Sequence, residues 1–123
     1  PFPQVIGIES QSSLNALARE NIARAKSKLA CPTIDILSVD ARQYRVPDDV
    51  TVIFMYNPFR GDILDTVLEQ IRRSLSSTPR RIRLLYLFPH SQCDPLATCD
   101  WLRLDDEIPT GHWDWVRFKV YES

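Results

Sequence analysis

Short apolar runs alternate along the chain with longer segments in which apolar residues recur every three or four positions. Four runs rich in β-branched and aromatic residues are predicted to be strands, at positions 5–9, 33–39, 51–56 and 81–88. Two segments have the spacing of amphipathic helices, from about Ser12 to Leu29 and from Asp62 to Leu75. Strands that alternate with helices pair in parallel through right-handed crossovers. The pattern therefore predicts one α/β domain over residues 1–123, with a doubly wound, Rossmann-like and mostly parallel sheet.

The run TVIFMY at 51–56 is typical of a strand that is buried on both faces, as in a parallel sheet. Pro58 cannot continue the hydrogen-bonded ladder, so the strand is predicted to end just before it. Asn57 and Phe59 would then lie in the loop at the carboxyl end of the strand. Ligands of open α/β sheets bind at this edge, which makes the loop a candidate site.

The last third of the chain has a less regular pattern. It predicts a short helix at 94–99, a short strand at 101–104 and a final strand at 113–121. Because the two strands are close in sequence and have no helix between them, they are expected to form an antiparallel hairpin at one edge of the sheet.

The charge balance does not indicate a nucleic-acid or anionic-membrane partner. The formal net charge is −1 with 25% charged residues, and the 44% of hydrophobic residues is ordinary for a globular core. No apolar run is long enough to span a bilayer and no signal peptide is visible, so a cytoplasmic protein is expected. A cluster of arginines is interpreted as a solvated, helix-stabilising surface rather than an RNA site: Arg72, Arg73, Arg80, Arg81 and Arg83.

The cysteine and histidine residues predict no metal site. Cys31, Cys93 and Cys99 are odd in number, and together with His90 and His112 they lack the paired short spacings of structural zinc sites. Reduced thiols are therefore the expected state of the cysteines.

Polar residues follow the predicted strands where each strand ends: Glu9, Asp40, Asn57 and His90. In a parallel sheet these ends lie along one edge. A carboxylate there can accept hydrogen bonds from both hydroxyls of a ribose, and a second carboxylate can accept from the exocyclic amine of an adenine. An acid in this place can also cap the next helix, and for Glu9 the two interpretations have similar weight.

Several of these segments resemble class I S-adenosylmethionine-dependent methyltransferases, over roughly residues 4–90. VIGIES at 5–10 and the helix after it look like the family's second strand and helix, and VDA at 39–41 looks like its adenine-binding turn. FMYNPF at 54–59 is similar to the family's motif IV, and residues 79–89 are similar to its fifth strand. The resemblance implies a methyltransferase with S-adenosylmethionine as cofactor and an acceptor, such as an amine, that the sequence does not identify.

The resemblance also implies a role for each matched position. The cofactor-binding positions correspond to Glu9, Ser10, Asp40, Ala41 and Asn57. Glu9 would hold the ribose hydroxyls, and Asp40 would hold the adenine amino group. The catalytic positions correspond to Asn57, Pro58 and Phe59, with Asn57 near the methyl-donor sulfur and Phe59 stacked against the acceptor.

The sequence departs from the family at its beginning. The family's first strand and Gly-rich cofactor loop would precede Pro1, and the chain has only three glycines. This part of a methyltransferase domain is expected to bind cofactor weakly and to be inactive alone. The missing strand would lie between the strands that end in Glu9 and Asn57, so these two are expected to pair directly or through a neighbouring chain, as in a homo-oligomer.

Two other classes of protein stay open. A non-catalytic nucleotide-binding or protein-interaction module could keep the same strands without the cofactor loop. A nicotinamide-binding domain also has an acid at the end of its second strand, although NPF at 57–59 argues against that class. Amine methyltransferases with the strongest signature carry two prolines in this motif, so the single Pro58 argues against an adenine or glutamine acceptor.

Overall fold

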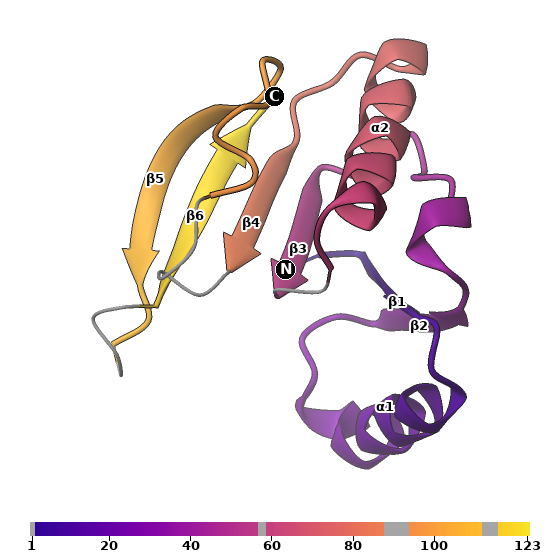
Figure 1. Ribbon diagram of the computed structural model, residues 1–123. Coiled ribbons are helices and arrows are strands. Elements are labelled where there is room, and N and C mark those ends of the chain that lie inside the picture. Colours follow the sequence, from indigo (N-terminus) through magenta and orange to yellow (C-terminus); the bar gives the residue numbers. More distant parts are fainter. Residues whose placement is uncertain (1, 57–58, 88–93, 112–115) are drawn as a thin grey trace. The chain divides into compact units, whose positions relative to one another are not determined.

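The structure is a computed structural model that describes residues 2–56, 59–87, 94–111 and 116–123 (Figure 1). Its contacts divide the chain into two compact units, residues 1–44 and 45–123. Each unit has at least one helix and a sheet of its own. The predicted α/β class is therefore confirmed, whereas the single domain and the doubly wound sheet stay predictions.

The first unit is a strand–helix–strand structure. β1 (Gln4–Glu9) and β2 (Thr33–Ser38) form a two-stranded parallel sheet, connected through α1 (Ser12–Ala25) and the short 3-10 helix η1 (Lys26–Lys28). Gln4 lies opposite Thr33 and Glu9 lies opposite Ser38, so the two strands begin and end together. A second 3-10 helix, η2 (Ala41–Gln43), follows β2. The predicted parallel pairing of these two strands through a helix is confirmed.

α1 differs from its prediction at its start and on its packed face. Neither Ser10 nor Ser12 caps the helix; the N-cap is Gln11, whose side chain makes no capping bond. Leu17, expected on the apolar face that packs on the sheet, is 52% exposed. The buried residue of α1 is instead Asn15, which is 1% exposed. The helix therefore buries an amide close to the carboxyl ends of β1 and β2.

The second unit contains a four-stranded sheet with the order β3-β4-β6-β5, and α2 (Figure 1). β3 (Val52–Tyr56) and β4 (Arg83–Leu87) are parallel and are connected through α2 (Asp62–Ser77). β5 (Arg103–Pro109) and β6 (Arg117–Glu122) form the predicted antiparallel hairpin. β6 also pairs antiparallel with β4, so the last strand lies inside the sheet and β5 forms its edge.

The composition of the two hairpin strands explains their order. β6 contributes the buried Val120 and Tyr121, whereas β5 carries three consecutive acidic residues, Asp105, Asp106 and Glu107. A central strand would have to bury some of these charges, while an edge strand can leave them in water. The acidic strand therefore occupies the edge position.

The segment between β4 and β5 differs from its prediction. Residues 95–98 form turns rather than the expected helix, and Leu96 is buried there. β5 begins at Arg103 and continues to Pro109, well beyond the strand predicted at 101–104. Residues 113–115 of the predicted final strand lie outside the described residues, and β6 begins at Arg117.

The apolar core of the second unit comes from α2 and the middle of the sheet. Leu64, Leu68 and Ile71 are buried at spacings of four and three residues, as the pattern of an amphipathic helix requires. Leu84 and Tyr86 lie two positions apart on β4 and are 0% and 1% exposed. Complete burial of an apolar side chain of this size contributes about 1.5–3 kcal/mol to the free energy of unfolding. This burial holds α2 on the sheet.

β3 is not buried on both faces, which corrects the prediction for this strand. Met55 is buried, but Phe54 is 59% exposed and Tyr56 is 66% exposed. Alternate residues of a strand point to opposite faces of the sheet, so Phe54 and Tyr56 share the face opposite to Met55, and among the described residues this face is left largely uncovered. Phe54 contacts Phe118 of β6 obliquely, with 5.6 Å between the ring centroids. The exposed residues of β3 therefore form an aromatic surface.

Arg80, from the predicted basic cluster, is a structural anchor. Its Nε donates to the carbonyl of Val50 at 2.7 Å, and its Nη2 donates to the carbonyl of Pro47 at 3.0 Å. The same guanidinium donates to the carbonyl of Thr78 at 3.0 Å and to the Oγ of Ser74 at 2.9 Å. These bonds fasten the carboxyl end of α2 to the loop before β3. The helix-stabilising interpretation of the cluster therefore holds for this residue.

Candidate functional site

The cofactor-binding residues predicted in the first unit lie at one edge of its sheet. Glu9, the last residue of β1, is opposite Ser38, the last residue of β2. Asp40 follows Ser38 by two positions and is the N-cap of η2, which begins at Ala41. Because parallel strands that end together direct their following loops to the same edge, the two carboxylates share this edge.

The Glu9 carboxylate supports the start of α1 and can still accept further hydrogen bonds. Its Oε1 accepts a hydrogen bond from the backbone N–H of Gln11 at 2.8 Å, which supports the start of α1. A carboxylate has about four lone-pair sites, so this bond leaves Glu9 able to accept others. Glu9 is half-buried, and the neighbouring Ser10 is exposed. The capping and the ligand-binding interpretations are thus compatible in one residue.

Asp40 is held by Arg42. Its Oδ1 accepts from the backbone N–H of Arg42 at 2.9 Å, and its Oδ2 accepts from the Arg42 Nη2 at 2.5 Å. The hydrogen bonds from the Arg42 side chain, followed by the backbone bond, keep the pKa of Asp40 below its usual range. The Asp40 side chain is 31% exposed. It is therefore an ionised acceptor that remains accessible from solvent.

The predicted catalytic segment is only partly covered by the structure. Asn57 and Pro58 lie outside the described residues, so their roles stay predictions. Phe59 is half-buried and belongs to the second unit. The predicted site residues that the structure brings to one edge are those of the first unit: Glu9, Ser10, Asp40 and Ala41.

Asn15 is a further polar residue at this edge, and the sequence analysis missed it. Its Nδ2 donates to the backbone carbonyl of Glu9 at 2.9 Å and to the Oγ of Ser38 at 2.6 Å. An asparagine in a polar first helical turn resembles any solvent-exposed residue. The available signal was its position one helical turn after the N-cap Gln11, close behind the strand-ending Glu9.

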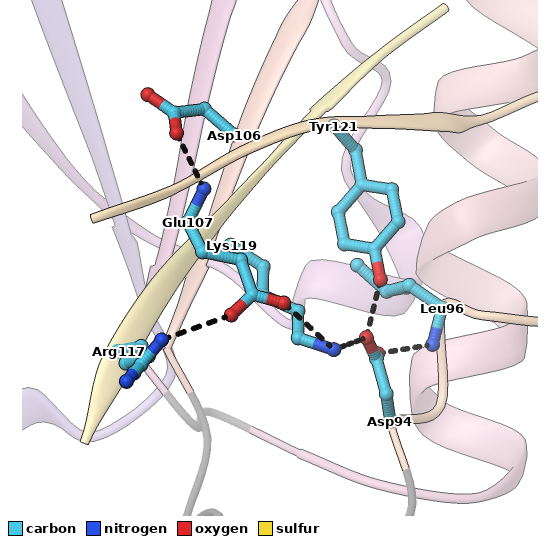
Figure 2. A network of polar contacts seen from close by, with 7 residues as sticks. All are labelled: Asp94, Leu96, Asp106, Glu107, Arg117, Lys119 and Tyr121. Atoms are coloured by element: carbon cyan, nitrogen blue, oxygen red, sulfur yellow. Dashed lines mark hydrogen bonds and ion pairs between the residues drawn. The ribbon is translucent and has the colours of Figure 1, made fainter. Parts of the chain in front are cut away.

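A second group that sequence reasoning missed lies in the second unit, on β6 and the segment before β5 (Figure 2). Asp94 accepts hydrogen bonds from the Nζ of Lys119 at 2.7 Å, from the hydroxyl of Tyr121 and from the backbone N–H of Leu96 at 2.9 Å. The Asp94 side chain is 8% exposed. A carboxylate this well buried is stable only because it has several donors.

The network around Asp94 continues to β5. The Nζ of Lys119 lies 3.8 Å from Glu107, and the other oxygen of Glu107 lies 3.6 Å from Arg117 (Figure 2). Burial, followed by the hydrogen bond to Asp94, raises the pKa of Tyr121 above its usual range. The network joins the segment after β4 to the hairpin, and we assign it a structural role.

The described residues offer few other candidates for metal binding or catalysis. Within residues 2–56, 59–87, 94–111 and 116–123, no three His, Cys, Asp or Glu side chains gather in a way that could hold a metal ion. Cys31 and Cys99 are free thiols, while His90, Cys93 and His112 lie outside the described residues. No helix of the described ranges is long and apolar enough to cross a membrane.

Solved structures include several proteins with a similar fold. A candidate methylase from Haemophilus influenzae matches with a TM-score of 0.64 and 15% sequence identity, over 98% of this chain and 72% of that one. The candidate methyltransferase yhhF from Escherichia coli matches with a TM-score of 0.68 and 14% identity, over 98% and 64%. A conserved hypothetical protein from Streptococcus pyogenes matches with a TM-score of 0.65 and 16% sequence identity, over 98% of this chain and 72% of that one. No protein-family model and no curated protein matches the sequence.

The chain therefore has the fold of these methyltransferase-like proteins, and the resemblance seen in the sequence is confirmed at the level of the fold. It spans 64–72% of the length of these three proteins. A fold shared at this level of identity does not by itself carry an activity, so function has to be argued from the residues of the site.

Proposed function

We propose that the chain is part of an S-adenosylmethionine-dependent methyltransferase and that its first unit binds the adenosine portion of the cofactor. The observation that carries the proposal is the common edge of Glu9 and Asp40, which follow two parallel strands that end in register. Two carboxylates at adjacent strand ends suit the ribose and the adenine of a nucleoside. The fold of the candidate methylases supports the same conclusion.

The residues of this edge fit the cofactor chemically. One oxygen of Glu9 is engaged by Gln11, and its carboxylate retains lone pairs for the two ribose hydroxyls. Asp40 already accepts from three N–H groups of Arg42, and a carboxylate has about four lone-pair sites, so one exocyclic amine can join the existing bonds. The contact with Arg42 also keeps Asp40 ionised, which makes it a stronger acceptor.

The proposed chemistry demands positioning rather than proton transfer. S-adenosylmethionine, when bound, supplies a methyl group on a sulfonium that is already a good electrophile. The protein then contributes mainly orientation and exclusion of water. In this proposal Glu9 and Asp40 orient the adenosine, Asn57 accepts a hydrogen bond from an amine acceptor, and Phe59 stacks against that acceptor.

We further propose that both sheets belong to one doubly wound, Rossmann-like sheet that needs an additional strand. Within the described residues β1 pairs only with β2, and β3 pairs only with β4, so one edge of each strand has no partner. Unpaired backbone groups are costly where they are buried away from water, and an exposed apolar edge is a surface on which another strand can pair. A parallel strand from a longer form of the chain, or from a neighbouring copy, would satisfy these edges.

Calorimetric titration with S-adenosylhomocysteine tests the proposed function. We expect the wild-type protein to bind, and Glu9→Ala and Asp40→Ala to weaken binding about tenfold or more, because each loses charge-assisted hydrogen bonds. Asp35→Ala is the matched control, since it removes an exposed carboxylate from the middle of β2. Absence of binding to the wild type, also in its longest natural form, would contradict the proposal and favour the interaction-module class.

A further inference from the structure

One side chain, Asn15, holds the carboxyl ends of β1 and β2 together. Its amide donates to the carbonyl of Glu9, at the end of β1, and to the Oγ of Ser38, at the end of β2. The two bonds are 2.9 and 2.6 Å long, and they connect Asn15 to residues 6 and 23 positions away in sequence. Asn15 thus connects Glu9, which is predicted to bind the ribose, to the strand that leads to Asp40.

The burial of Asn15 has no simple explanation in packing. Asn15 is 1% exposed, and within the described residues its Oδ1 is a buried oxygen without a hydrogen-bond partner. A buried polar atom without a partner destabilises a fold, and a leucine of similar size would avoid that cost. Positions where local rules are broken in this way are often tied to function.

We propose that Asn15 is a positioning residue of the adenosine site, which fixes the separation between Glu9 and the turn that carries Asp40. This inference rests on the proposed function. The Glu9 carbonyl that receives the amide belongs to the same residue as the ribose-binding carboxylate. The Ser38 hydroxyl lies two residues before Asp40. Fixing both strand ends with one rigid amide therefore presets the spacing of the two carboxylates.

The contacts also explain why loss of Asn15 should affect ligand binding more than folding. Glu9 is half-buried and Ser38 is exposed, so the two acceptors that lose the amide can bind water instead. A leucine at position 15 would also remove the unpaired Oδ1. The strand ends would then stay folded but lose their fixed spacing. Binding of the cofactor would have to order them, and this would weaken the affinity.

Two variants and one control test the positioning role by calorimetry with S-adenosylhomocysteine. Asn15→Leu is expected to weaken binding roughly five- to tenfold, and Ser38→Ala, which removes one of the two acceptors, is expected to weaken it less. The exposed Asn21→Ala, on the same helix, should bind like the wild type. The thermal unfolding temperature of each variant, measured without ligand, should shift little. This result would distinguish a positioning role from a merely structural one.

A double-mutant cycle with Glu9→Ala gives the decisive comparison. If Asn15 acts by positioning Glu9, Asn15→Leu will weaken binding much less in the Glu9→Ala background than in the wild type. Additive effects, or equal binding by wild type and Asn15→Leu, would overturn the positioning role while the proposed function stands. A wild type that binds no S-adenosylhomocysteine would overturn the proposed function, and the positioning role with it.

Discussion

The buried hydroxyl of Tyr121 donates to Asp94, and this contact contributes to the response of the protein to alkaline pH. Burial, and then the hydrogen bond to Asp94, raises the pKa of Tyr121. An unfolded tyrosine loses its proton above about pH 10, while folded Tyr121 keeps it, so the folded state binds more protons there. The contribution to the free energy of unfolding is therefore complete below about pH 10 and is lost as the pH rises further.

Tyr121→Phe is expected to lower the free energy of unfolding at neutral pH by about 1–2 kcal/mol, because buried Asp94 loses a donor. The decline at alkaline pH should also become shallower than in the wild type. Urea denaturation at neutral pH and on both sides of about pH 10 measures both effects. Tyr56→Phe, which changes an exposed tyrosine, is the control. An alkaline decline of the same steepness in Tyr121→Phe would contradict this assignment.

Arg42 is expected to control the ionisation of Asp40. In Arg42→Ala the pKa of Asp40 should rise toward its ordinary value, because the side-chain hydrogen bonds that lower it are removed. A carboxyl NMR titration of Asp40 measures this change directly. Arg45→Ala removes an exposed arginine five positions further along the chain and should leave the titration as it is in the wild type. If Arg42→Ala titrates like the wild type, another group lowers the pKa of Asp40.

The sequence reveals some of these residues and hides others for a physical reason. Glu9 and Asp40 were predictable because an acid that ends an apolar run leaves a local pattern. Asn15 leaves no such pattern, since its partner Ser38 is 23 positions away and comes near only through the parallel pairing of β1 and β2. The Asp94 network is hidden in the same way, because Lys119 and Tyr121 meet Asp94 only after β6 has paired with β4.

Among the elements, those set by local periodicity were predicted best. β1, β2 and α2 have nearly the bounds that their apolar patterns indicate. The position of β6 inside the sheet was missed, because the order of strands depends on which of them can be buried rather than on any one strand's pattern. The exposure of β3 was missed for a related reason, since an apolar run does not tell whether another element packs on each face of the strand.

The junction between α2 and the loop before β3 should depend on Arg80. Arg80→Met keeps much of the aliphatic length but removes the donors to Pro47, Val50 and Ser74. We expect a loss of about 2–3 kcal/mol in the free energy of unfolding, because several partly buried acceptors lose a charged donor together. Chemical denaturation measures the loss, and Arg72→Met, an exposed change on α2, should cost little. Equal stability of the two variants would show that Arg80 is not an anchor.

At the scale of the whole molecule, the free edge of β3 is the feature with the widest consequence. Phe54 and Tyr56 are exposed on a strand that, among the described residues, pairs on one side only. An apolar edge without a charge or a proline is a surface on which another strand can pair. The chain spans 64–72% of the length of the three neighbours described above, so the proposed additional strand is compatible with either a longer chain or a second copy.

If a second copy completes the edge, the protein will self-associate through β3, and Phe54→Lys will weaken the association because a charged edge strand resists pairing. Light scattering over a range of concentrations measures this, with 14.2 kDa as the mass of one chain. Ile108→Lys is the matched control, since it places the same charge at an exposed apolar position on β5, the opposite edge of the sheet. An association that Phe54→Lys leaves unchanged would place the interface elsewhere. A wild type that stays at the mass of one chain would rule out the second copy as the source of the proposed additional strand.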